Sequence, residues 1–237
     1  MKKIGVFDSG IGGFTVLEEI KKVLPNESYI YYADSKHNPY GEKSDDELYG
    51  IVCNVVEFLI LHEVKLIVIA CNTATTRCMK RLKEDYKDIL FVGIVPAVKV
   101  ACDHAFKHTL IMATPGTVSS KRMEELILDN KREDQEIMAI SCDGLAHLIE
   151  IKDDVGIDQK LEEIFRDFRD DDFDSIVLGC THYPLIKDKI SRYFPRAILL
   201  DGSLGVAKEV KRQLETHGLL NEKMTSSEVE IFNSNVC

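Results

Sequence analysis

The sequence predicts an α/β protein of two pseudo-symmetric lobes, each a parallel-type sheet flanked by helices, with the active site in the cleft between them. Three observations indicate this fold. Short apolar runs alternate with amphipathic segments along most of the chain, which is typical of βαβ units. The apolar runs are nearly continuous, as in strands that are buried on both faces of a sheet. The motifs of the first half also return in the second half, in the same order.

Eight apolar runs are expected to form the strands. They are "KIGVFD", "SYIYYAD", "KLIVIAC", "ILFVGIV", "HTLIMAT", "QEIMAIS", "SIVLGC" and "AILLD". Amphipathic segments with helical spacing lie between them, and they cover Thr15–Leu24, Asp45–His62, Thr75–Asp85, Ser119–Asp129 and Asp158–Arg169. Strands and helices therefore alternate in both halves of the chain.

The internal repeat has matching spacing in its two copies. "IGVFDSGIGGFTVL" is answered by "TLIMATPGTVSSKRM", and "LIVIACNTAT" by "SIVLGCTHYP". Asp8 precedes Cys71 by 63 residues, and Thr114 precedes Cys180 by 66 residues. Ligands of open parallel sheets bind outside the carboxyl ends of the strands, where all four segments end. We therefore expect a cleft between two facing lobes, and the alternative is a chance likeness of unrelated strand–helix turns.

The lobe boundary is expected at Pro96, because this proline follows a strand and begins a helix-like run. Residues 1–95 then form the first lobe, and residues 96–203 form the second. A C-terminal helix within 204–237 rejoins the first lobe. Its helical pattern covers Leu204–His217, and the polar tail beyond it is assigned no structure.

Composition excludes several classes of protein. Of the 237 residues 45% are hydrophobic, which is enough for a folded core, and the formal net charge is −10. This charge argues against nucleic acid or an anionic membrane surface as a main partner. No apolar stretch is long enough to span a membrane, and the beginning of the sequence has no apolar signal segment. The seven cysteines, an odd number, favour reduced thiols. We therefore expect a cytoplasmic protein.

Two of the cysteines have positions suited to chemistry. Cys71 and Cys180 each end a strand just before a helix N-terminus, where the helix dipole is expected to lower the pKa of a thiol. Small polar residues that can bind ligand oxygens follow each of them. The remaining cysteines are expected to be buried structural residues, and they are Cys53, Cys78, Cys102, Cys142 and Cys237.

Proton partners for these thiols are found in two places. Asp8 ends the first strand, and its glycine-rich loop leaves the backbone open to close approach by a ligand; alternatively, Asp8 caps the following helix. His182 stands two residues after Cys180, where it can tune a thiol or move a proton, or else lie satisfied in the core. The glycines do not form a complete dinucleotide-binding motif.

A rigid turn at Pro39, Tyr40 and Gly41 offers backbone amides and a phenol to a carboxylate, although such turns are also ordinary connections.

A phosphatase is a competing interpretation, because Arg77 follows Cys71 at the Cys-x5-Arg spacing of cysteine phosphatases. That loop contains no glycine, however, and a phosphatase gives the second cysteine segment no role.

The segments "VFDSGIGGFTV", "PYGEKS", "ACNTAT" and "LGCTHYPL" resemble, in order, four signature segments of the glutamate racemases. The resemblance implies a cofactor-independent racemase, with no metal, that makes D-glutamate for bacterial peptidoglycan. Its substrate is a small molecule bound between the lobes, and a homodimer is among the implied assemblies. Aspartate racemases share the two-cysteine plan, so the aspartate alternative stays open. So does a ligand-binding protein of this fold without turnover.

The resemblance also implies roles for individual residues. Cys71 would act on the D-enantiomer with help from Asp8, and Cys180 on the L-enantiomer with help from His182. Glu150 matches a family glutamate near His182, although the usual Glu-Gly does not follow it here. The substrate's amino and carboxylate groups would be bound by Ser9, Pro39, Tyr40, Gly41, Asn72, Thr73, Thr114, Thr117 and Thr181. Thr114-Pro115 and the short polar C-terminus depart from the family pattern.

Overall fold

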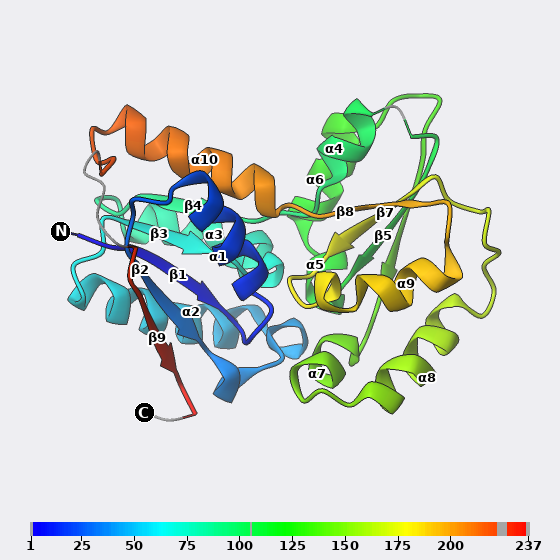
Figure 1. The fold of residues 1–237 in the computed structure, drawn as a ribbon, viewed down its shortest axis with the longest axis horizontal. Helices are drawn as coiled ribbons and strands as arrows, with labels where there is room; N and C mark the ends of the chain where they lie inside the picture. The colour runs from blue at the N-terminus through cyan, green and yellow to red at the C-terminus, as the bar shows by residue number, and fades with distance from the viewer. Residues whose placement is uncertain (1, 105, 222–226, 236–237) are drawn as a thin grey trace.

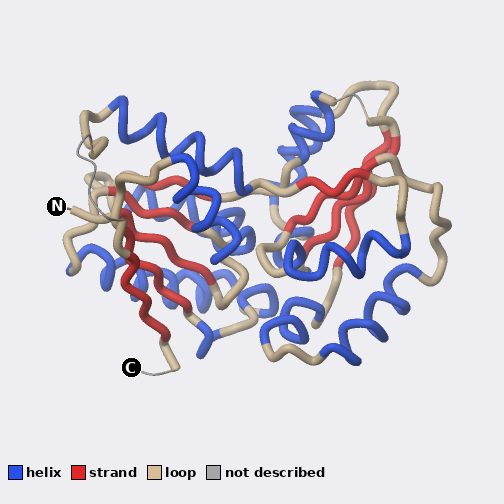
Figure 2. The backbone as a smooth tube through the Cα atoms, viewed as in Figure 1, coloured by secondary structure: helices blue, strands red, loops and turns tan. Residues whose placement is uncertain are grey.

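The computed structural model describes residues 2–104, 106–221 and 227–235, and their strands form two separate parallel sheets (Figures 1 and 2). The first sheet has the order β4-β3-β1-β2-β9, built from β1 (Ile4–Asp8), β2 (Tyr29–Ala33), β3 (Leu66–Ile69), β4 (Phe91–Gly93) and β9 (Val229–Asn233). The second has the order β6-β5-β7-β8, built from β5 (His108–Ala113), β6 (Glu136–Ser141), β7 (Ser175–Gly179) and β8 (Ile198–Leu200).

The two sheets repeat one topology. In each, the first strand lies inside the sheet, the second pairs on one side of it, the third on the other side, and the fourth beyond the third. All pairings are parallel. The α/β fold with two helix-flanked parallel sheets, predicted from the sequence, is therefore confirmed.

Helices cover both faces of the first sheet because apolar side chains lie on both faces of its strands. The helices α1 (Phe14–Val23) and α10 (Ser203–Thr216) pack on one face, around side chains such as Val6 and Ile20. On the other face α2 (Asp45–Leu61) and α3 (Asn72–Asp85) pack around Phe7 and Ile69. This two-sided burial explains why the strands are continuously apolar.

The second sheet is covered in the same way. One face packs against α7 (Leu145–Glu150), α8 (Asp154–Phe165) and α9 (Lys187–Tyr193), and the other against α4 (Val98–Asp103) and α6 (Lys121–Asn130). Short helical turns complete the connections, and they are α5 (Pro115–Val118) and the 3₁₀ helices η1 (Ser35–His37), η2 (Tyr40–Glu42) and η3 (Tyr183–Ile186).

The C-terminal segment differs from the expectation of one helix within 204–237. The helix α10 ends at Thr216, and Gly218 adopts a positive φ of 62° there, a conformation that glycine permits at a helix end. The chain then adds β9 to the edge of the first sheet, parallel to β2, with Asn233 opposite Ala33. The segment "VEIFN" is short and partly polar, so its strand signal was lost within the polar tail.

Two further expectations concern thiols and membranes. The six cysteines among the described residues are all free thiols, and Cys237 lies outside the described residues. Of the helices in the described ranges, none combines the length and the apolar character needed to cross a bilayer.

A buried ion pair joins three connecting segments of the first lobe, which precede β2, precede β3 and follow α10. Lys65 Nζ lies 2.6 Å from Glu27 Oε2, and these side chains are 7% and 2% exposed. Lys65 also donates to the carbonyl of Leu219 at 2.7 Å, and Glu27 accepts from the backbone N–H of Asn221 at 2.8 Å. The pair therefore fixes the segment after α10 against the segments that lead into β2 and β3.

Replacing Lys65 with Met is expected to lower the free energy of unfolding by about 3–5 kcal/mol, because it leaves the Glu27 carboxylate buried without its cation. Urea unfolding followed by circular dichroism measures the loss. The control is Lys99→Met, which breaks an exposed pair with Asp103 and is expected to leave the midpoint unchanged. An equal effect of both substitutions would contradict the role assigned to the buried pair.

Candidate active site

The functional residues meet because the two sheets direct the carboxyl ends of their inner strands toward each other (Figure 1). The loops that follow β1, β3, β5 and β7 surround one small cavity. It is lined by Ser9, Asn38, Pro39, Tyr40, Gly41, Cys71, Asn72, Thr73, Thr114, Ala146, Cys180, Thr181 and His182. Both candidate cysteines therefore border the same space, one from each sheet.

This cavity is nearly closed. Its volume of about 20 Å³ is close to the space of a single water molecule. A larger hollow of about 580 Å³ lies near His108 and Phe168, at the opposite end of the second sheet, and it contains none of the candidate residues. The candidate residues therefore point to the small cavity.

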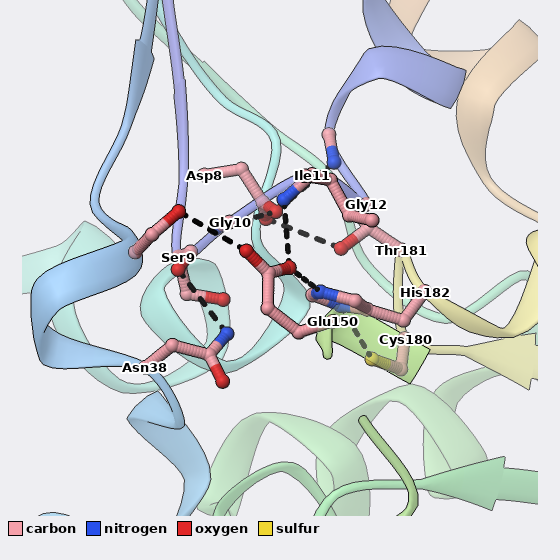
Figure 3. A network of polar contacts seen from close by, with 12 residues as sticks. Asp8, Ser9, Gly10, Ile11, Gly12, Asn38, Glu150, Cys180, Thr181 and His182 are labelled. Carbon is pink, nitrogen blue, oxygen red and sulfur yellow. Dashed lines mark hydrogen bonds and ion pairs between the residues drawn. The ribbon is translucent and has the colours of Figure 1, made fainter. Parts of the chain in front are cut away.

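A chain of three side chains forms the second-lobe half of the site. Cys180 Sγ lies 3.7 Å from His182 Nδ1, and His182 Nε2 lies 2.7 Å from Glu150 Oε2 (Figure 3). Burial acts to lower the pKa of His182, but its contacts with Cys180 and Glu150 raise it to about 10. The imidazole therefore keeps a positive charge beside the Cys180 sulfur at neutral pH.

Glu150 also connects the two lobes. Its Oε2 accepts a hydrogen bond from the backbone N–H of Ile11 at 2.9 Å (Figure 3). Its Oε1 accepts one from Ser35 Oγ at 3.0 Å. Although burial acts to raise the pKa of Glu150, the hydrogen bonds from His182, Ile11 and Ser35 hold it below its usual value. A carboxylate thus remains available as acceptor for the imidazole.

Asp8 has contacts that fit both interpretations of its position. Its Oδ2 accepts from the backbone N–H groups of Gly10 and Gly13 at 3.2 and 3.0 Å, just before α1. Its Oδ1 accepts from Thr181 Oγ1 of the other lobe at 3.1 Å. Burial raises the pKa of Asp8, against the opposing effect of the His182 charge. Asp8 therefore orders the glycine loop and contacts Thr181, which lines the cavity, although Asp8 itself is not one of the lining residues.

Cys71 is held in a different state from the one expected. It occupies the N-cap of α3, where the dipole was expected to lower its pKa. Instead burial and the negative charge of Asp8 raise the pKa of Cys71 well above its ordinary value, because desolvation disfavours a thiolate. Its sulfur lies 3.9 Å from Ser9 Oγ. The two cysteines are therefore in unlike environments, because Cys71 is held as a neutral thiol whereas the Cys180 sulfur lies beside the imidazolium of His182.

Three hydroxyl groups from both lobes contact one another beside the cavity, which Thr73 and Thr114 line and Thr117 does not. Thr73 Oγ1 lies 2.8 Å from Thr114 Oγ1 and 3.2 Å from Thr117 Oγ1, and the latter two lie 3.0 Å apart. Two amide oxygens, Asn38 Oδ1 and Asn72 Oδ1, are buried without a partner among the described residues. The hydroxyls suit a carboxylate, and the free acceptors suit an ammonium group.

The glycine loop serves inter-lobe packing rather than a phosphate. A Cβ added at Gly12 would lie 2.7 Å from His182 Nδ1, and one added at Gly10 would lie 2.2 Å from Glu150 Oε2. The groups that approach this backbone closely are therefore side chains of the second lobe. The expected approach of a ligand to this backbone stays a prediction.

Two further side chains have other contacts than the sequence suggested. The Tyr40 phenol donates to Asp34 Oδ2 at 2.6 Å, so it is engaged and leaves only the backbone of this turn to a ligand. Arg77 binds Asp45 Oδ1 through Nε at 2.7 Å and the Lys43 carbonyl through NH2 at 2.8 Å. Since its guanidinium is engaged away from the Cys71 sulfur, the geometry does not support the phosphatase alternative.

No group of three His, Cys, Asp or Glu side chains among the described residues is arranged to hold a metal ion.

Comparison with known proteins shows the family to which the chain belongs. The family model of the Asp/Glu/hydantoin racemases matches residues 9–208. The chain belongs to this racemase family.

Relatives within the racemase family match nearly the whole chain. The chain is 43% identical to a glutamate racemase of Clostridium perfringens, over 98% of this chain and 90% of the relative. Among solved structures, a glutamate racemase isoform of Bacillus anthracis has a TM-score of 0.86 at 28% identity, covering 98% of this chain and 88% of the other. A glutamate racemase of Francisella tularensis in complex with D-glutamate has a TM-score of 0.82 at 30% identity, with the same coverage.

The sequence had indicated most of the residues around this racemase cavity, but not all. It missed Asn38 and Ala146 in the cavity lining, and Ile11 and Ser35 as partners of Glu150. Asn38 stands directly before the quoted turn "PYG", so its position was a usable signal. The other three contribute a methyl group, a backbone N–H and a hydroxyl in ordinary surroundings, for which the sequence has no distinctive pattern.

Proposed function

We propose that this protein is a glutamate racemase that inverts the α-carbon by a two-cysteine, cofactor-independent proton transfer. The observation that carries the proposal is the placement of Cys71 and Cys180 on one cavity, from two different sheets. Inversion of a stereocentre needs a proton acceptor on one face and a donor on the other. The names of relatives that cover nearly the whole chain support glutamate as the substrate.

The two thiols differ in which one carries a proton in the resting enzyme. Cys180, paired with the charged His182, is the thiolate that removes the α-proton of L-glutamate. The C–H electron pair moves into the α-carboxylate, and Cys71, kept as a neutral thiol, gives its proton to the opposite face. Cys180 then carries the proton and Cys71 the charge, so that D-glutamate reacts by the reverse sequence.

The carbanion must be stabilised without an electron-withdrawing cofactor. Thr73, Thr114 and Thr117 supply hydroxyl donors to the α-carboxylate, where negative charge develops. The buried oxygens of Asn38 and Asn72 accept from the α-ammonium group. Closure of the lobes to a nearly filled cavity excludes water and strengthens these interactions. The expected cytoplasmic location, homodimer and supply of D-glutamate for peptidoglycan accompany this proposal and rest on the same relatedness.

The proposal predicts that purified protein, dialysed against EDTA, abolishes the circular dichroism of L-glutamate as a racemic mixture forms. L-Aspartate under the same conditions should change far more slowly. Faster racemisation of aspartate would instead support the aspartate alternative. Binding of glutamate without any loss of its dichroism would support the non-catalytic alternative.

A further inference from the structure

Each of the two carboxylate oxygens of Glu150 accepts a hydrogen bond from a residue of the first lobe. Ile11 N–H reaches Oε2, which His182 also contacts, whereas Oε1 has the Ser35 hydroxyl at 3.0 Å. Ser35 begins η1, directly after β2 in the first lobe. It is half-buried and touches no cavity-lining thiol through any contact that the structure gives.

The C-terminal strand supplies a second partner to the Ser35 hydroxyl, with a geometry that agrees with donation to Glu150. Asn233, the last residue of β9, has its Nδ2 3.3 Å from Ser35 Oγ. The Asn233 Oδ1 atom accepts from the backbone N–H of Asn235 at 2.9 Å, which assigns the amide orientation. Because an amide NH₂ only donates, Ser35 Oγ accepts from it, and the hydroxyl proton points to Glu150 Oε1.

Backbone pairing holds this arrangement in register. Asn233 lies opposite Ala33 in the parallel ladder, and Ser234 N–H donates to the Ala33 carbonyl at 3.0 Å. Lys36 N–H in turn donates to Ser234 Oγ at 3.0 Å. The backbone pairing of β9 with β2 therefore sets the position of Asn233 beside Ser35, whereas the Ser234 hydroxyl contacts only the Lys36 N–H among the contacts that the structure gives.

We propose that Ser35 is a positioning residue for the Cys180 half of the reaction, and that β9 orients it through Asn233. The proposal rests on the proposed function. The Ser35 hydroxyl holds Oε1 and so fixes the plane of the Glu150 carboxylate, so that Oε2 accepts from His182 and the imidazole stays directed at the Cys180 sulfur. The Ser35 hydroxyl, which lies outside the cavity, thereby acts on Cys180 through Glu150 and His182.

The test compares Ser35→Ala with two matched variants. Ser35→Thr keeps the hydroxyl, and Ser234→Ala removes a neighbouring hydroxyl of the same η1–β9 junction that does not contact Glu150 in the structure. Ser35→Ala is expected to lower kcat/KM about tenfold, the effect of one hydrogen bond to a charged group. It should also move the acid limb of the pH profile to higher pH, since Glu150 then takes up a proton more readily. Ser35→Thr and Ser234→Ala should stay near wild type.

Isotope effects separate positioning from general loosening of the fold. The ratio of kcat/KM for L- and D-glutamate cannot change, because the enantiomers have equal free energy in water. The primary effect of α-deuterium should rise for L-glutamate relative to D-glutamate in Ser35→Ala, since proton transfer at Cys180 becomes more rate-limiting. Unchanged isotope effects, or a rise for D-glutamate instead, would overturn the proposal. So would a loss of activity shared equally by Ser234→Ala.

A readout without turnover distinguishes failure of this proposal from failure of the proposed function. The His182 ring resonances in NMR titrations should report protonation of Glu150 at low pH, and Ser35→Ala should move that step to higher pH, because the hydrogen bond that favours the carboxylate is gone. Asn233→Asp should have a similar effect, because a carboxylate accepts the Ser35 proton and withdraws it from Glu150. An unmoved step in Ser35→Ala contradicts the positioning role even in a protein that does not racemise glutamate.

Discussion

Alanine at Cys71 or at Cys180 is expected to lower kcat/KM for glutamate racemisation by about 10³-fold or more in both directions, which lies within the usual effect of a general acid or base. In the proposed mechanism each thiol serves one face of the substrate, so the loss of either one removes a proton donor or acceptor that the other cannot replace. The fall must be equal for L- and D-glutamate, because the equilibrium constant between enantiomers cannot change. Polarimetric or circular dichroism rates with each enantiomer measure it.

Cys78→Ala is the matched control, since Cys78 is a buried cysteine on α3 that lines the core rather than the cavity. It is expected to keep activity while losing some stability through the small void it creates. Near wild-type racemisation by either Cys71→Ala or Cys180→Ala would remove the basis of the two-cysteine mechanism. Far-ultraviolet circular dichroism of each variant should match wild type.

His182→Asn is expected to lower kcat/KM about 10²-fold at neutral pH and to change the pH dependence. The pKa of His182 is raised to about 10 through its contacts with Cys180 and Glu150, although burial opposes this. In the wild type the proton therefore stays on His182 through neutral pH and is lost only as the pH approaches that value. The variant has no positive charge beside the Cys180 sulfur to favour a thiolate, so activity of the variant should rise with pH where the wild type is level.

The pH–rate profiles of wild type and His182→Asn test this prediction directly. His108→Asn is the control, because His108 begins β5 at the far end of the second sheet and is exposed. Its profile should coincide with that of wild type. Parallel profiles for His182→Asn and wild type would show that the imidazole does not sustain the thiolate.

The fold could be predicted from the sequence because its strands are buried on both faces. Continuous apolar runs such as those of β1, β3 and β7 indicate strands buried on both faces of a parallel sheet. The repeated motifs identify the two sheets. The edge strand β9 could not be predicted in this way. It is half-exposed, contains Glu230, and follows a polar segment, so its place depends on pairing with β2 rather than on its own pattern.

The candidate site divides similarly between what is local and what is not. Cys71 and Cys180 could be singled out because each ends a strand, and strand position is a local property. The state of Cys71 could not be predicted, because its raised pKa depends on burial and on Asp8 from another strand. The contacts of Glu150 with Ile11 and Ser35 cross between lobes, and spacing within a sequence holds no information about them.

The central claim is that two opposed thiols act one on each face of the substrate, and hydrogen isotopes test it most directly. L-Glutamate is incubated with the protein in D₂O, the reaction is stopped early, and the separated enantiomers are analysed by mass spectrometry. The proton added to the product comes from a second thiol that has exchanged with solvent. The account therefore predicts deuterium at the α-carbon of the new D-glutamate, while the remaining L-glutamate keeps its protium. New D-glutamate that retains the substrate's own α-protium would show transfer by a single base and would contradict the account.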